Sequence, residues 1–185
     1  MESTAAILLR KTRYSDTSLI VNWFTAAHGK IKTIAKGALR PKSRFAGTLD
    51  LFYECEIAIS RSPKSDLHTL REAALSDSRE NLRRDYPSVA LAAYFVELLD
   101  LTTEADHPAP ELFDLLSRAL RHLDQKAPTL RALEHYENEL TRLLGIQHPG
   151  VTALIAIGRA YHRIPSSRPQ VLKLLGAENS GTSSE

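Results

Sequence analysis

The spacing of apolar residues changes once along the chain, close to residue 75, and this change limits the folds that are available. Before it, apolar and polar residues alternate in short runs, as in half-buried strands. After it, leucines recur three or four residues apart, as in amphipathic helices. The sequence therefore predicts an α+β chain, a β module followed by a helical bundle, with a junction near residues 75–86.

Five strands are predicted in the first part, separated by turn signals every eight to twelve residues. That spacing favours a small barrel or a sandwich. In the fourth strand, Leu51, Tyr53, Cys55, Ile57 and Ile59 share one face, which we expect to line the core. The predicted strands are Ala5–Tyr14, Thr17–Thr25, Lys30–Lys36, Leu49–Arg61 and Leu67–Ala74.

The second part predicts helices, the first of which is apolar on two faces and is therefore expected to be central. Pro87 is expected to begin this helix, since proline is tolerated in a first turn. On the third helix, Leu130, Leu133 and Tyr136 are expected to point inward, among others, and Glu134, Glu137 and Glu139 outward. The predicted helices are Ser88–Leu101, Glu111–Asp124, Thr129–Leu144, Val151–His162 and Pro169–Leu175.

We expect two domains and a tail: residues 1–76, residues 77–177 and a polar, disordered segment at 178–185. The net charge of +2 hides a difference between them. Residues 1–75 carry 12 Lys and Arg against 7 Asp and Glu, whereas residues 76–185 carry 12 against 15. This asymmetry suggests that the first module faces a polyanion.

No apolar run approaches the roughly 20 residues of a membrane span, and basic residues end the short apolar run Ala5–Leu9. We therefore expect a cytoplasmic protein without a signal peptide or membrane contact. The single Cys55 rules out an internal disulfide and a cysteine-based zinc site. Its place in a strand favours a buried apolar filler over a reactive nucleophile.

The strongest candidate site is the stretch Gly29–Gly47, which holds six basic residues and no acid. Alternation puts the first lysines on one face of a strand, and the rest follow in a loop that contains Pro41. Such a surface suits phosphates, although a solvated strand face is the simpler reading of most charge runs. The six residues are Lys30, Lys32, Lys36, Arg40, Lys42 and Arg44.

Four aromatic residues are candidates for stacking on nucleic-acid bases. Phe45 is the best of them, because it lies within the basic loop. Trp23 and Phe24 point to opposite faces of a strand, so at least one belongs to the core, and Trp23 is interpreted as core. Tyr14, beside a basic residue in a turn, fits either role.

No group of residues indicates catalysis, so we do not expect an enzyme. Asp16 and Ser18 lie in a turn whose backbone their side chains stabilise, and His28 precedes the turn glycine Gly29. We interpret all three as structural.

The chain resembles the RecO family of bacterial DNA repair proteins. The resemblance covers about residues 5–145 and rests on R-K-T-R-Y-S-D-T-S-L-I-V, F-T-A-A-H-G-K-I and A-K-G-A-L-R-P-K-S-R-F-A-G-T-L-D-L-F. The order of the helical segments and an L-L-G after the third helix also look like this family. The resemblance implies an OB-fold five-stranded barrel followed by an all-helical domain.

The resemblance also implies a function: binding of single- and double-stranded DNA, annealing of complementary strands, and recombinase loading with RecR on strands coated by single-strand-binding protein. The DNA contacts would then be the six basic residues and Phe45, on a nucleoid-associated protein without a cofactor. The acidic C-terminal tail of single-strand-binding protein would need an apolar groove rimmed by arginine. Arg118, Arg121 and Arg131 lie beside leucine stripes and fit such a rim, or are ordinary solvated charges.

The chain departs from the family after the L-L-G. Many members carry four cysteines there in zinc-finger spacing, whereas residues 145–162 contain none, so we expect no metal. Two other readings stay open: an OB-fold module that binds RNA, and a protein scaffold whose basic face docks an acidic partner.

Overall fold

The structure, a computed structural model, describes residues 1–179. It contains two compact units. Residues 1–78 and 103–113 form the barrel unit, and residues 79–102 and 114–179 form the helical unit. Each unit is described by itself.

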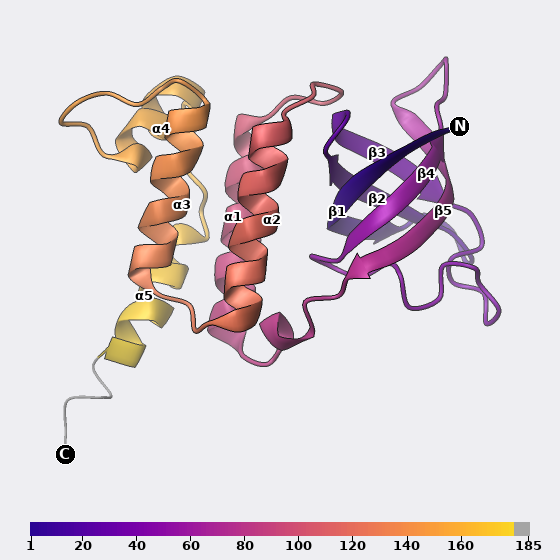
Figure 1. Cartoon of the computed structure of the whole chain (residues 1–185), viewed down its shortest axis with the longest axis horizontal. Coiled ribbons are helices and arrows are strands. Elements are labelled where there is room, and N and C mark those ends of the chain that lie inside the picture. Colours follow the sequence, from indigo (N-terminus) through magenta and orange to yellow (C-terminus); the bar gives the residue numbers. More distant parts are fainter. Residues whose placement is uncertain (180–185) are drawn as a thin grey trace. The chain divides into compact units, whose positions relative to one another are not determined.

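Five strands close into a barrel with the order β1-β2-β3-β5-β4 (Figure 1). Neighbouring strands are antiparallel except for β3 and β5, which are parallel. The predicted five-stranded OB-fold barrel is confirmed, and the sandwich alternative is wrong. The strands are β1 (Glu2–Arg13), β2 (Leu19–Thr25), β3 (Gly29–Ala35), β4 (Glu54–Ser60) and β5 (Leu67–Asp77).

The barrel core contains Cys55, Ile57 and Ile59, as the alternation predicts. Trp23 is also fully buried there, and its indole Nε1 donates a hydrogen bond to Thr33 Oγ1 at 2.9 Å. This bond satisfies the one polar atom of the largest buried side chain.

The core prediction was wrong for Leu51, which is 37% exposed. β4 begins only at Glu54, and the residues before it form a turn in which Phe52 has a φ of 66°. The strand alternation therefore does not extend back to Leu51, and Phe52 is buried instead.

The helical unit follows the predicted order of helices, with boundaries within a few residues of those expected. None of the helices within residues 1–179 is long and apolar enough to cross a membrane. A short 3₁₀ helix at Glu80–Arg83 precedes α1 (Tyr86–Thr102), α2 (Pro110–Gln125), α3 (Leu130–Leu143), α4 (Ala153–Tyr161) and α5 (Arg168–Asn179).

α1 is buried on two faces, as expected, with both Leu98 and Leu99 fully covered. Its Phe95 ring stacks on Tyr136 of α3, with centroids 4.1 Å apart, and Tyr136 donates a hydrogen bond to the Phe95 carbonyl. Leu130, which was expected to point inward, is 40% exposed because it lies at the first position of α3.

Glu137 corrects a second expectation about α3. It was assigned to the exposed face, yet it is 3% exposed and forms an ion pair with Arg168 at the start of α5. The guanidinium donates from Nε to Oε1 at 2.7 Å and from its second nitrogen to Oε2 at 3.1 Å, and the Tyr94 hydroxyl also donates to Oε1. The carboxylate raises the pKa of Arg168, and burial followed by this hydrogen bond raises the pKa of Tyr94.

α4 lies after the L-L-G, within residues 145–162, which contain no cysteine. It buries Ala153, Ala156 and Ile157, and Tyr161 at its end donates a hydrogen bond to the Thr102 carbonyl. Within the described chain no three His, Cys, Asp or Glu side chains gather as metal ligands would. Of the predicted tail, residues 178–179 belong to α5 and residues 180–185 lie outside the described part.

Candidate nucleic-acid interface

The basic stretch divides between β3 and the long connection to β4. Lys30 and Lys32 lie on β3, and four cations follow in the connection. Lys30 is half-buried, whereas the four in the connection are all exposed. They are Lys36, Arg40, Lys42 and Arg44. We call residues 36–47, which contain all four, the basic loop.

Successive backbone turns give the basic loop a defined shape. The amide of Arg40 donates to the Gly37 carbonyl, that of Ser43 to the Arg40 carbonyl, and that of Ala46 to the Ser43 carbonyl, all at 3.0–3.1 Å. The cations are therefore carried on ordered backbone, so fewer conformations are lost when a ligand binds.

Phe45 corrects the expectation that it stacks on bases. Its side chain is 3% exposed and belongs to the barrel core, with the Arg44 guanidinium 4.9 Å from the ring centroid. A ring in the core is not accessible to a base, and burial of this apolar side chain instead anchors the basic loop to the barrel.

Lys32 differs from the loop cations because it has an acidic partner. Its Nζ lies 3.1 Å from a carboxylate oxygen of Asp66, and the lysine lowers the pKa of that carboxyl. The stretch contains no acid in sequence, but Asp66 lies next to it through the parallel pairing of β3 with β5. A phosphate at Lys32 would have to displace this exposed carboxylate.

The start of β3 is attached to a segment from the connection between α1 and α2. Ala105 forms a parallel bridge with Lys30, and the Asp106 amide donates to the Lys30 carbonyl at 2.9 Å. Gly29, beside it, has a φ of 66°, and a Cβ there would lie 2.0 Å from the His107 carbonyl oxygen. Lys30 is therefore held at its backbone by residues far away in sequence.

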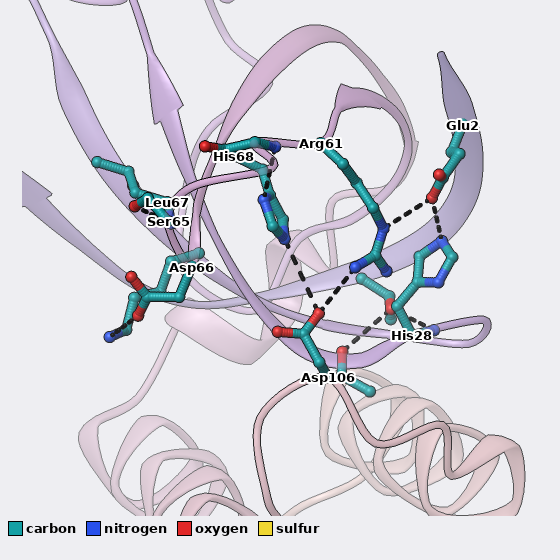
Figure 2. A network of polar contacts seen from close by, with 12 residues as sticks. Glu2, His28, Arg61, Ser65, Asp66, Leu67, His68 and Asp106 are labelled. Carbon is teal, nitrogen blue, oxygen red and sulfur yellow. Dashed lines mark hydrogen bonds and ion pairs between the residues drawn. The ribbon is translucent and has the colours of Figure 1, made fainter.

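Side chains around this bridge form the polar network of Figure 2, with Arg61 at its centre. Arg61 donates to Glu2 at 2.9 Å and to Asp106 at 3.1 Å. The hydrogen bond from Arg61 lowers the pKa of Glu2, and that carboxylate raises the pKa of Arg61. His28 approaches Glu2 to 3.3 Å, and the buried His68 lies 3.8 Å from Asp106. This placement agrees with the structural role that we assigned to His28.

An apolar groove of about 520 Å³ lies within the helical unit, mainly between α2 and α3. Arg118 and Arg131 line it, but Arg121 does not. The sequence interpretation missed three further basic side chains of the lining, His122, Lys126 and His135, because no apolar pattern marks them. The lining, which contains no acid, comprises Phe95, Leu115, Arg118, Ala119, His122, Lys126, Thr129, Arg131, Ala132, His135 and Tyr136.

Two family models match the chain over most of its length. Recombination protein O N terminal matches residues 1–79, and Recombination protein O C terminal matches residues 83–149. The chain belongs to the RecO family. The first match ends within one residue of where the first segment of the barrel unit ends.

Relatives named DNA repair protein RecO support this membership. That of Salinibacter ruber is 35% identical over 144 residues, 77% of this chain and 55% of the relative. That of Rhodopirellula baltica is 33% identical over 171 residues, 92% of this chain and 62% of the relative. That of Bacillus pumilus is 40% identical over 119 residues, 64% of this chain and 46% of the relative. The chain spans about half to three-fifths of the length of these RecO proteins.

Proposed function

We propose that this RecO-family chain is a non-catalytic mediator of DNA repair and recombination that binds DNA and anneals complementary single strands on the nucleoid. The observation that carries the proposal is the basic loop. Its four exposed cations stand on ordered backbone, and residues 29–47 contain no acid. The chain's relatives carry a DNA repair name, which favours DNA as the polyanion.

The basic loop suits binding without sequence preference, because contacts from lysine and arginine to phosphate oxygens carry no sequence information. Annealing needs this property, since any two complementary strands must be held. If about 4–6 phosphates of a single strand are neutralised, log K should fall with log salt at a slope of about −3 to −4.

Annealing by the variant with Lys36, Arg40, Lys42 and Arg44 all changed to Ala tests the proposal. The wild-type chain should accelerate annealing of complementary oligonucleotides in a salt-sensitive manner, and the variant should lose at least about tenfold of that acceleration. The measurement is the annealing rate of labelled strands over a salt series, with and without single-strand-binding protein.

The matched control changes four exposed cations of the helical unit to Ala: Arg84, Arg159, Arg163 and Lys173. It alters the net charge equally and should anneal as the wild type does. Normal annealing by the basic-loop variant would exclude the proposed interface. A preference of tenfold or more for RNA over DNA would favour an RNA-binding module instead.

The proposal also includes two partners. This chain assists recombinase loading together with RecR, and the groove of its helical unit binds the acidic tail of single-strand-binding protein. Charge complementarity supports the groove: Arg118, Lys126 and Arg131 line an apolar floor that contains Leu115 and Tyr136. A carboxylate-rich tail that ends in an apolar residue matches both features.

A synthetic acidic peptide that ends in an apolar residue should therefore bind, and changing Arg118 and Arg131 together to Ala should weaken it by about tenfold or more. Arg121→Ala is the control, since this arginine does not line the groove. The measurement is a titration of the labelled peptide by fluorescence anisotropy. Equal weakening by the control would assign the effect to overall charge and would argue against the groove.

A further inference from the structure

The turn between β1 and β2 presents an aromatic side chain to solvent. Tyr14 is 60% exposed, although it follows directly on a strand whose middle, residues 4–9, is largely buried. By contrast Trp23, Phe24 and Phe45, the other aromatic candidates of the sequence, are between 0% and 3% exposed. Within the described barrel residues, Tyr14 is the one aromatic side chain that is more than half exposed.

Hydrogen bonds fix the backbone that carries this ring. The amides of Tyr14 and Ser15 both donate to the Ser18 carbonyl, at 3.0 and 3.3 Å. The Arg13 side chain lies along the same turn, where it donates to the Ser15 carbonyl and to the Asp16 carboxylate. The ring of Tyr14 therefore projects from an ordered turn, so stacking on it costs little conformational entropy.

The same turn is joined to the basic loop. The amide of Leu39, a residue of the basic loop, donates to the Thr17 carbonyl at 3.0 Å. Thr17 follows Tyr14 by three positions in the sequence, so the turn that carries the exposed ring contacts the loop directly. Arg40, a loop cation, follows Leu39 immediately. Proteins that hold unpaired strands combine exposed aromatic side chains with positively charged grooves.

We propose that Tyr14 is a stacking platform for an unpaired base of a single strand whose phosphates the basic loop holds. The inference rests on the proposed DNA binding. It adds that the Tyr14 ring contacts a base, whereas the basic loop contacts the phosphates. In OB-folds the loop between the first two strands belongs to the oligonucleotide-binding surface, and here that loop carries Tyr14. Bases of a duplex are already stacked, so this contact would favour single strands.

Binding of two oligothymidylates of equal length, one normal and one abasic, tests the inference. The abasic strand retains the phosphates and sugars and lacks the bases. Tyr14→Ala should weaken binding of the normal strand by about 5- to 150-fold, which corresponds to the roughly 1–3 kcal/mol of a base–aromatic stack. It should leave binding of the abasic strand and the salt slope unchanged, and Tyr14→Phe should bind the normal strand as the wild type does.

Tyr86→Ala is the matched control, because Tyr86 is equally exposed, at 59%, and belongs to the helical unit. It should bind both strands normally. Unchanged binding of the normal strand by Tyr14→Ala, or an equal loss on both strands, would overturn the inference while the proposed DNA binding stands. Failure of the wild-type chain to bind either strand would overturn the proposed function itself. Emission from the buried Trp23 checks that each variant is folded.

Discussion

Replacing Glu137 by Ala is expected to lower the free energy of unfolding of the helical unit by about 3–5 kcal/mol. The Arg168 side chain is only 18% exposed and donates two hydrogen bonds to this carboxylate. Without the carboxylate, a guanidinium is left largely buried with no opposite charge, and the Tyr94 hydroxyl loses its acceptor as well. Urea unfolding followed by far-UV circular dichroism measures the loss.

Glu139→Ala is the control on the same helix. Glu139 pairs with Arg142 at 2.9 Å, but the arginine is 55% exposed, so the loss should be at most about 1 kcal/mol. Replacing Glu137 and Arg168 together by Leu should recover most of the stability, because no buried charge is then left alone. If Glu137→Ala cost no more than Glu139→Ala, the buried pair would not be what holds α5 to α3.

Replacing Gly29 by Ala is expected to destabilise the barrel unit because the new Cβ would meet the His107 carbonyl oxygen at 2.0 Å. This steric contact should cost about 1–3 kcal/mol, in addition to the cost of placing alanine in a left-handed backbone. Either the strand or residues 105–107 must then move. The bond from the Asp106 amide to Lys30 should be lost, so exchange of that amide with solvent should accelerate. Urea unfolding followed by Trp23 fluorescence gives the stability, and amide exchange reports the contact.

Gly47→Ala separates the steric contact of a new Cβ from the conformational cost of alanine in a left-handed backbone. Gly47 has a similar φ of 75°, but a Cβ there would meet nothing within 4 Å, so only the conformational cost of about 1–2 kcal/mol should appear. Asp106 exchange should be unaffected. Equal destabilisation by both substitutions would mean that the close approach at Gly29 is relieved without cost.

Local periodicity was sufficient to predict most of the fold. Alternation placed Cys55, Ile57 and Ile59 in the barrel core, and the spacing of leucines predicted the helices in their order. Both are properties of neighbouring residues, which share a face because of backbone geometry alone. The same reasoning located the basic loop, whose charges follow one another in sequence.

The predictions that failed depend on contacts between distant residues. Phe45 lies in a loop without periodicity, so nothing local distinguished a core anchor from an exposed ring. Glu137 was assigned to the exposed face because its partner, Arg168, is 31 residues further on. Asp66 beside Lys32 was missed for the same reason, as pairing of β3 with β5 creates that contact.

The assignment of residues 103–113 to the barrel unit also has a consequence for biosynthesis. When Ser78 leaves the ribosome all five strands have emerged, but Ala105 and Asp106, which contact Lys30, have not yet emerged. At about 5–20 residues per second, the 35 residues from there to Phe113 take roughly 2–7 s to synthesise. During that interval the nascent barrel has no partner for the Lys30 carbonyl from this segment, and α1 is made before the barrel unit is complete. A fragment that ends at residue 78 therefore corresponds to this nascent state and not to the mature unit.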